Sequence, residues 1–294
     1  RGGVSYVRVA EDRPEGEAAI ETVITAAKGA GLYTKHLYRI RENWNGILIT
    51  SLLRNETKLE RKVKLNDSWT KFGSEGRAGD IRWADSVDPA DGRGYAYRWD
   101  WKDGKKPSEI TLAAGQEITV ERFLAVGSSP LSAVGELLKR SGNTGSLTGR
   151  VVGVDNEKVS NVQILAKVNG GSVSGYTEED GSFSFSFPKG QIYDLSFKDV
   201  GRVTQSAAFD LKGNDSAERE IRLPSQSAVV FDIKDGKGIS IPCKVQFNGS
   251  GKTKAPNLGP NNRAHGCVDQ YQSERGDFRV TVPPGTYRIV VTHG

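Results

Sequence analysis

The stretch GSFSFSFPKG at residues 181–190 recurs as GDFRVTVPPG at residues 276–285. Both copies open on glycine, alternate polar and apolar residues, and end in a proline, one further residue and a glycine. Alternation with a period of two indicates a half-buried strand, and the flanking glycines and prolines indicate turns. A strand-and-turn motif that occurs twice predicts two copies of one small β unit. The fold class that this predicts is all-β.

The residues around each copy extend the repeat into two units. Residues 146–224 hold the first copy, with apolar runs before it and a turn at Asp155. Residues 225–294 repeat this order, with the corresponding turn at Asp235. The two turns lie closer together than the two glycine-opened motifs do, so the later unit carries an insertion. We place it in the segment 252–265, and we expect two β-sandwiches, the second truncated at its C-terminus.

Residues 1–142 precede these units and alternate in the same way over many short runs bounded by Gly, Asn and Asp. This pattern predicts a large antiparallel β-sandwich. Helical patterning is scarce, but residues 129–140 start with Ser129 and Pro130 and end with basic residues, as a helix does. We predict one helix there, which closes the first domain and stops at Gly142.

Composition excludes several classes of protein. The net charge is only +5 and the basic residues are dispersed, so no nucleic-acid partner is expected. No apolar run is long enough for a membrane span. The chain contains no methionine and stops at Gly294 directly after an apolar strand, so we expect a processed piece of a longer, exported protein.

The unit 146–224 resembles the carboxypeptidase regulatory-like β-sandwich, which has a transthyretin-like fold. The matching features are GRVV at residues 149–152, the turn Asp180-Gly181-x-Phe183, and Pro188-x-Gly190. Members of this family are mostly accessory modules of secreted multidomain proteins. The resemblance implies a fold and does not imply a reaction.

The unit 225–294 resembles a more particular group. Residues 242–247, 258–264, 278–285 and 288–290 are similar to the region upstream of the PHP domain in bacterial metallohydrolases related to carbaryl hydrolase, the CehA/McbA group. Residues 21–26 and 112–127 of the first domain resemble the sandwich with which these metallohydrolases begin.

This resemblance implies a non-catalytic accessory region of an exported bacterial hydrolase, whether periplasmic, on the cell surface or secreted. The divalent metal would belong to a downstream catalytic domain, and no cofactor or metal ligand is expected in this chain. The expected partner is that domain, or a second chain that completes the last sandwich. Gly259, Pro260, Arg263 and His265 form the expected interaction loop.

A second hypothesis is a binding or assembly module without enzymatic activity. Trp83, Trp99 and Trp101 lie near one another in the sequence and would offer indole faces on which a glycan could stack. The alternative is that half of these aromatic side chains fill the core. Assembly by strand addition is the other form of this hypothesis. A hydrolase site inside the first sandwich is a third alternative, although no Gly-x-Ser-x-Gly elbow occurs.

Cys243 and Cys267 flank the insertion. A disulfide would close that loop and suit an exported protein, and the alternative is two separate thiols. A metal site with His265 lacks a fourth ligand.

Asp85, Asp88 and Asp91 offer hard oxygen ligands, but their spacing is not that of a calcium loop. A solvated acidic turn is the simpler interpretation.

Overall fold

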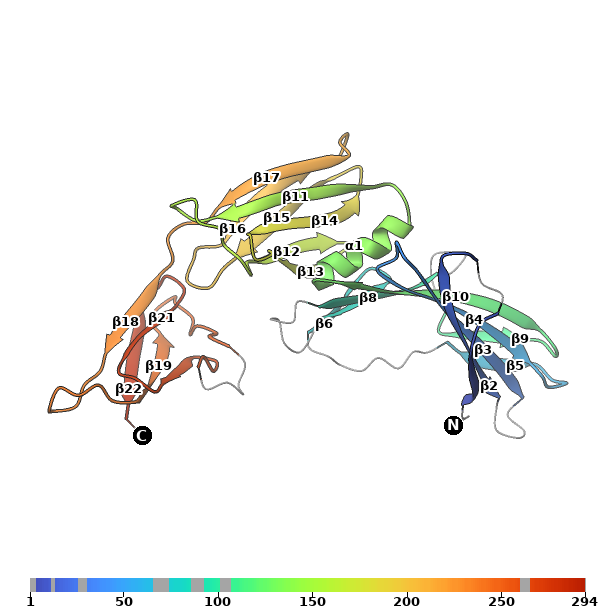
Figure 1. The fold of residues 1–294 in the computed structure, drawn as a ribbon, viewed down its shortest axis with the longest axis horizontal. Helices are drawn as coiled ribbons and strands as arrows, with labels where there is room; N and C mark the ends of the chain where they lie inside the picture. Colours follow the sequence, from blue (N-terminus) through green and yellow to red (C-terminus); the bar gives the residue numbers. More distant parts are fainter. Residues whose placement is uncertain are drawn as a thin grey trace.

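The computed structural model describes residues 4–11, 14–25, 31–65, 74–85, 93–100, 107–259 and 265–293. Within these ranges the chain forms strands and a single helix, so the predicted all-β fold class is confirmed. Figure 1 shows three groups of strands that follow one another from the blue N-terminal end to the red C-terminal end. No helix in this described part is long and apolar enough to cross a membrane.

The first group is built on an antiparallel sheet with the strand order β1-β2-β3-β4-β10-β8-β7-β6. Its strands are β1 (Val4–Val9), β2 (Glu17–Thr25), β3 (Leu32–Arg41), β4 (Gly46–Asn55), β6 (Glu75–Ala78), β7 (Ile81–Asp85), β8 (Gly94–Asp100) and β10 (Glu117–Gly127). β10 returns from far along the chain to pair with β4 on one side and β8 on the other. The centre of the sheet therefore depends on long-range pairing.

A two-stranded ribbon lies over one face of this sheet. It consists of β5 (Arg61–Lys64) and β9 (Glu109–Leu112). Val63 and Leu112 of the ribbon share a small buried core with Leu53 and Val120 of the sheet. The second layer of the first sandwich is thus much smaller than the first.

Asn55 fixes the ribbon at the end of β4. Its side chain is fully buried, and its Nδ2 lies 2.8 Å from the carbonyl oxygen of Leu59 and 3.0 Å from those of Leu112 and Ala113. Its Oδ1 accepts hydrogen bonds from the backbone N–H of Thr57 at 3.0 Å and from the Thr57 hydroxyl at 2.8 Å. One side chain therefore joins β4, the following turn and the end of β9.

The helix α1 (Pro130–Arg140) confirms the prediction for residues 129–140. Ser129 is its N-cap and accepts a hydrogen bond from the N–H of Ser132 at 3.2 Å. The buried face of α1 belongs to one hydrophobic core that includes Trp83 and Phe123 of the first sheet and Phe185 of the second group. In Figure 1 the helix lies between these two groups. The predicted limit at residue 142 therefore separates two sets of strands without dividing their core.

The second group is a sandwich of two sheets. One has the order β14-β11-β17 and the other β13-β12-β15-β16. The strands are β11 (Thr144–Val152), β12 (Gln163–Val168), β13 (Gly171–Tyr176), β14 (Ser182–Pro188), β15 (Ile192–Lys198), β16 (Gln205–Asp210) and β17 (Ser216–Arg222). The alternating stretch that opened the sequence analysis is β14, and its Phe183, Phe185 and Phe187 are all buried. β17 runs parallel to β11.

The third group repeats the second in part. Its sheets are β18-β21 and β20-β19-β22, formed by β18 (Ala228–Asp232), β19 (Cys243–Gly249), β20 (Gln270–Ser273), β21 (Asp277–Thr281) and β22 (Tyr287–Thr292). β21 corresponds to β14, because both carry the repeated motif, with Phe278 in the place of Phe183. β18 corresponds to β11, because Phe231 lies opposite Phe278 as Gly149 lies opposite Phe183. The insertion lies in residues 250–269, between β19 and β20. In the second group, the corresponding strands β12 and β13 are joined by only Asn169 and Gly170.

Two strands of the second group have no counterpart among the described residues of the third. In the second group β17 pairs with β11, and β16 pairs with β15. No described strand lies beside the corresponding edges of β18 and β22. Within the described residues, each sheet of the third sandwich therefore has one strand fewer than its counterpart in the second, beside β18 and beside β22.

Candidate functional site

Of the predicted tryptophan platform, the described residues place Trp83 and Trp99 on opposite faces of the sheet, and the glycan site as a whole stays a prediction. Trp83 of β7 lies opposite Ala96 of β8, so these two side chains share one face of the sheet. Trp99 is three residues beyond Ala96 on the same strand and projects from the opposite face, because strand side chains alternate. Trp83 is only 9% exposed and belongs to the core around α1. Trp101 lies outside the described residues.

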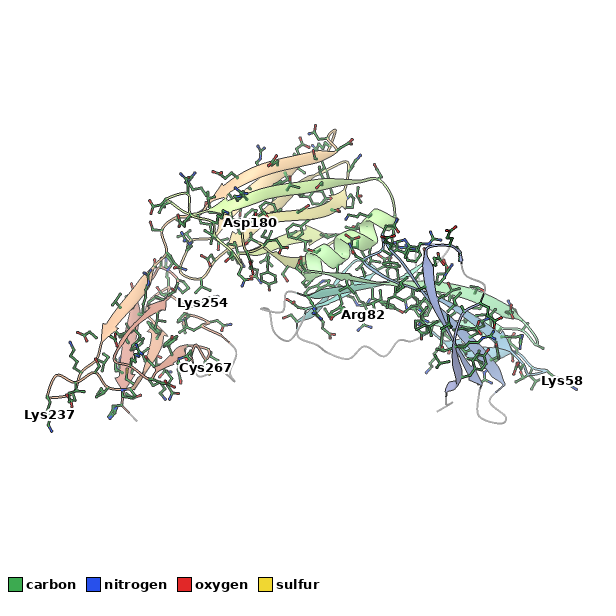
Figure 2. The ribbon with its side chains drawn as sticks, viewed as in Figure 1. Lys58, Arg82, Asp180, Lys237, Lys254 and Cys267 are labelled. Atoms are coloured by element: carbon green, nitrogen blue, oxygen red, sulfur yellow. The ribbon has the colours of Figure 1, made fainter. Side chains whose placement is uncertain are left out.

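Of the two alternatives for Cys243 and Cys267, a disulfide or two separate thiols, the structure has the second, with both cysteines free. Cys243 lies opposite Ser273 across the β19–β20 pair, whereas Cys267 bridges to Gln270. These two positions on β20 are three residues apart, or about 10 Å along a strand, and a disulfide needs Cα atoms within about 7 Å. Figure 2 shows Cys267 beside the third group of strands. Cys243 is buried, and this burial raises the pKa of its thiol.

The expected interaction loop is described only in part, since Pro260 and Arg263 lie outside the described residues. The carbonyl oxygen of Gly259 accepts a hydrogen bond from the N–H of Val268 at 2.9 Å. His265 is exposed, and its Nδ1 lies 2.7 Å from the carbonyl oxygen of Gln272. These contacts hold the base of the loop against β20 and bring no reactive group together.

The acidic triplet is described only at Asp85, because Asp88 and Asp91 lie outside the described residues. Asp85 is 7% exposed, and its Oδ2 accepts a hydrogen bond from the Tyr176 hydroxyl at 3.4 Å. This bond joins β7 to β13, so Asp85 takes part in the contact between the first two groups of strands. Within the described residues, no group of three or more His, Cys, Asp or Glu side chains could hold a metal ion.

The structure instead brings together His36, Ser51 and Arg122, which the sequence analysis did not select. His36 Nδ1 lies 2.6 Å from Ser51 Oγ, and Arg122 Nη2 donates to Ser51 Oγ at 2.5 Å. Arg122 Nη2 also lies 3.3 Å from His36 Nδ1. The Arg122 guanidinium lies over the Trp99 ring, 4.9 Å from its centroid.

The strand register explains this cluster. His36 of β3 lies directly opposite Ser51 of β4, and Ser51 lies opposite Val120 of β10. Arg122 is two residues beyond Val120 and so projects from the same face, where it lies opposite Trp99 of β8. Four adjacent strands thus place an imidazole, a hydroxyl, a guanidinium and an indole on the face covered by the ribbon.

The cluster forms one end of a cavity of about 200 Å³ between the sheet and the ribbon. The described residues that line it, apart from the four residues of the cluster, are Leu32, Thr34, Leu53, Val63, Lys64, Leu65 and Val120. His36, Trp99 and Arg122 are half-buried, so solvent reaches the cluster. The described lining combines polar side chains with aliphatic ones.

The geometry is suited to binding and not to nucleophilic catalysis. His36 Nδ1 lies within hydrogen-bond distance of both Ser51 Oγ and Arg122 Nη2. Ser51 is 2% exposed, and its Oγ accepts from Arg122, so the hydroxyl is held in the floor of the cavity. A serine nucleophile needs access to its substrate.

The opposite face of the same sheet carries ion pairs. Glu21 of β2 is buried and accepts from Lys35 Nζ at 2.5 Å and from Arg8 Nε and the Tyr6 hydroxyl, each at 3.1 Å. The hydrogen bond from Lys35 lowers the pKa of Glu21, which burial alone would raise. These contacts join β1, β2 and β3, so they fix strand register.

No family model and no curated protein matches this chain. Solved structures with a similar arrangement of strands include a streptococcal ancillary pilin, at 13% identity and a TM-score of 0.33, with 89% of this chain and 73% of the pilin covered. The GH36 α-galactosidase AgaA of Geobacillus stearothermophilus is 14% identical, with a TM-score of 0.31. That match covers 46% of this chain, and the chain spans 29% of the galactosidase. Likenesses this weak carry no argument about what the chain does.

Proposed function

We propose that this chain is a non-catalytic β-sandwich scaffold that precedes the metal-dependent hydrolase domain of an exported bacterial PHP-type protein. The observation that carries the proposal is the form of the third group of strands. It repeats the second group as far as β22, and the described residues hold no counterparts of β17 and β16 beside β18 and β22. In this proposal two further strands, the counterparts of β16 and β17, complete these sheets.

Side-chain exposure supports the need for completion. In the second group, Leu195 and Phe197 on β15 are fully buried and Tyr193 is 5% exposed. β22 is the counterpart of β15, yet its Val291 is 42% exposed and its Ile289 is only partly buried. In the second group, β16 and β17 contribute buried residues such as Phe209 and Ile221, which help to cover β15. The described part of the third group has no such strands, which explains the greater exposure of β22.

The second group also defines what the completing strands would be. A strand beside β22 would run antiparallel to it, as β16 does to β15. A strand beside β18 would run parallel to it, as β17 does to β11. Each would carry apolar side chains at alternate positions, because only one face of each strand would point into the core.

The proposed parent protein follows from the order of the sequence motifs. The resemblance to the CehA/McbA group covers the first domain, the insertion and the last strands in the same order. In such a protein the first two groups of strands, joined through α1, would form one rigid body. The third group would connect that body to the catalytic domain, which would hold the divalent metal.

Hydrolysis by the intact protein tests this proposal. The protein would be isolated at its natural length and assayed on p-nitrophenyl esters and phosphoesters, before and after dialysis against a chelator. We expect an intact mass above 31.9 kDa, the mass of this chain. We also expect hydrolysis that is lost with the metal and restored by Mn²⁺ or Zn²⁺.

Residues 1–294 expressed alone are the matched control, and we expect them to be inactive with or without metal. Hydrolysis by this control would contradict the proposal, because it would place an active site in the sandwiches. A natural protein with the mass of this chain and no metal-dependent activity would contradict it as well.

The same edges of β18 and β22 favour a second candidate, a module that assembles by accepting strands from another chain. An open sheet edge offers unpaired N–H and C=O groups that another strand can pair with. Sedimentation of the natural protein over a hundredfold range of concentration separates the candidates. A monomer supports completion within one chain, and a mass that rises with concentration supports assembly.

A further inference from the structure

We propose that a second copy of this chain pairs with the edge strand β1, so that two first groups join in one continuous sheet around a twofold axis. This inference does not depend on the proposed scaffold function, because β1 belongs to the first group and the completing strands belong to the third. In Figure 1 the dark blue N-terminal strands lie at the opposite end of the molecule from β18. Three features of β1 point to the pairing: its place in the sheet, the sorting of side chains between its faces, and the direction of its backbone groups.

β1 is an edge strand of the first sheet. Within the described residues, β2 is the only strand that pairs with it. The other edge strand, β6, lies against β13 of the second group, so closely that a side chain at Gly171 would collide with the carbonyl oxygen of Arg77. The chain thus covers the edge at β6 with its own second group. An edge without such cover offers N–H and C=O groups to a further strand.

The side chains of the first three strands are sorted by charge. One face carries the exposed apolar residues, which are Val7 and Val9 of β1, Ile20 of β2 and Ile40 of β3. Each of these is between 47% and 63% exposed. The Glu, Lys and Arg residues of the same strands all lie on the other face, with the ion pairs of Glu21. A group of exposed apolar side chains on one face is typical of an interaction surface.

The absence of charge on this face favours a second copy as the partner. Around a twofold axis the same surface meets itself, so a charge near the axis would face a like charge. Val7 and Val9 carry none, and each would instead gain apolar neighbours from the second copy. An uncharged apolar strand edge is therefore complementary to itself.

The backbone of β1 directs the required groups outward. The N–H of Ala10 donates to the carbonyl oxygen of Ala19 at 3.1 Å, so Ala10 forms a hydrogen-bonded pair with β2. Such pairs alternate with non-hydrogen-bonded pairs along two antiparallel strands. The N–H and C=O groups of Val7 and Val9 therefore point away from β2, where a second β1 would bind them.

Charge then selects the register of the two β1 strands. If Val7 lies opposite the second copy's Val7, Arg8 lies opposite the second copy's Tyr6. Arg8 already lies over the ring of its own Tyr6, 5.6 Å from the centroid, so this neighbour is favourable. If Val7 lay opposite Val9 instead, the two Arg8 side chains would face each other, which is destabilising. We therefore expect the twofold axis to pass at Val7.

Sedimentation velocity of residues 1–294 tests the pairing. We expect an equilibrium between monomer and dimer over a hundredfold range of concentration, and this contact should form nothing larger, because a twofold pair is closed. Val7→Lys should weaken the dimer by roughly tenfold or more, because it sets two like charges opposite each other at the axis. Val7 is exposed, so this variant should keep the melting temperature of the original chain.

Val230→Lys is the matched control. Val230 is 76% exposed on β18, beside which the described residues hold no counterpart of β17. The β1 dimer should form in this variant as it does in the original chain. The two variants also separate this dimer from assembly through the third group, which Val230→Lys would weaken and Val7→Lys would not.

Cysteine variants test the register. With Cys243→Ser and Cys267→Ser in place, Val7→Cys should give a disulfide-linked dimer under mild oxidation, because the Cα atoms of a hydrogen-bonded pair lie about 5.5 Å apart. Val9→Cys should not give this dimer. Its two copies would lie two residues from the axis on either side, about 14 Å apart along the strands.

Three results would overturn the proposal. One is a monomer at every concentration. Another is equal weakening of the dimer by Val7→Lys and Val230→Lys, which would show that any added charge has the same effect. The third is a disulfide-linked dimer that forms as readily from Val9→Cys as from Val7→Cys, which would show that the axis does not pass at Val7.

Discussion

The hydroxyl of Tyr287 donates to the carbonyl oxygen of Pro283 at 2.8 Å, and the hydroxyl of Tyr193 donates to that of Pro188 at the same distance. In each case the proline lies two residues before the end of the repeated motif, and the tyrosine lies on the following strand. The repeat thus includes a specific hydrogen bond as well as a pattern of apolar residues. Its surroundings differ, since Tyr193 is 5% exposed and Tyr287 is only partly buried.

Calorimetry of residues 1–294 should show two transitions. The third group has its own small core, with five buried residues among those described, and no described counterparts of β16 and β17, whereas the first and second groups share one core. The third group should therefore melt first and the other two together. A single transition that includes all three groups would contradict this, as would separate melting of the first two.

The two tyrosine hydroxyls should affect different transitions. Tyr287→Phe should lower only the first transition, and Tyr193→Phe only the second, each by about 0.5–1.5 kcal/mol for one lost hydrogen bond. Differential scanning calorimetry measures both shifts, with the unchanged transition as an internal control. If Tyr287→Phe moved the later transition instead, the assignment of the transitions would be wrong.

Leu137 should couple the first two groups of strands. It is fully buried in α1, within the core that both groups share. Leu137→Ala should cost about 2–5 kcal/mol and lower the shared transition without splitting it. Leu59→Ala is the control, because Leu59 is 76% exposed and should change stability by no more than about 0.5 kcal/mol.

Asn55 should be the most sensitive polar residue of the first group. Asn55→Ala leaves three carbonyl groups and the Thr57 donors without their partner, so we expect a loss of about 2–4 kcal/mol by urea unfolding. The control is Asn214→Ala, since Asn214 is exposed and makes one 3.3 Å bond to Asp210. Equal effects of the two variants would contradict the anchoring role.

The ion pairs of Glu21 should make the first group sensitive to acid. The pKa of Glu21 is lowered in the folded chain, chiefly by its hydrogen bond from Lys35. The stability that it contributes is present above the ordinary glutamate pKa of about 4.3 and is lost as pH falls through the lowered value. Urea midpoints at pH 7, 5, 4 and 3 should therefore fall less steeply with acid in Glu21→Gln.

Glu11→Gln is the control for this effect. Glu11 lies 3.8 Å from the same Arg8, but its side chain is 83% exposed, so its ion pair contributes little. Its pH dependence should match that of the original chain. If Glu21→Gln also matched the original chain, Glu21 would not be the group that titrates.

Local patterns in the sequence predict the elements that local interactions determine. Alternation at residues 181–190 predicts β14 with its phenylalanines inward, and Ser129 and Pro130 predict the start of α1. Both signals depend on residues close together in the chain.

The candidate site depends on pairing that the sequence does not display. His36 and Ser51 belong to neighbouring strands, and hairpin pairing from the turn at residues 42–45 would have placed them opposite each other. Arg122 arrives on β10 from much later in the chain, and no local pattern marks it. The same limit explains the tryptophans, because Trp83 and Trp99 lie on different strands whose relative register determines the face of each.

The central claim is that strands from outside residues 1–294 complete the third sandwich, and amide hydrogen exchange tests it most directly. Exchange would be compared at β18 and β22 in residues 1–294 alone and in the protein at its natural length. The account predicts fast exchange of the outward-facing amides of both strands in the short chain and strong protection in the natural protein. Equally fast exchange in both would show that these edges stay open and would contradict the claim.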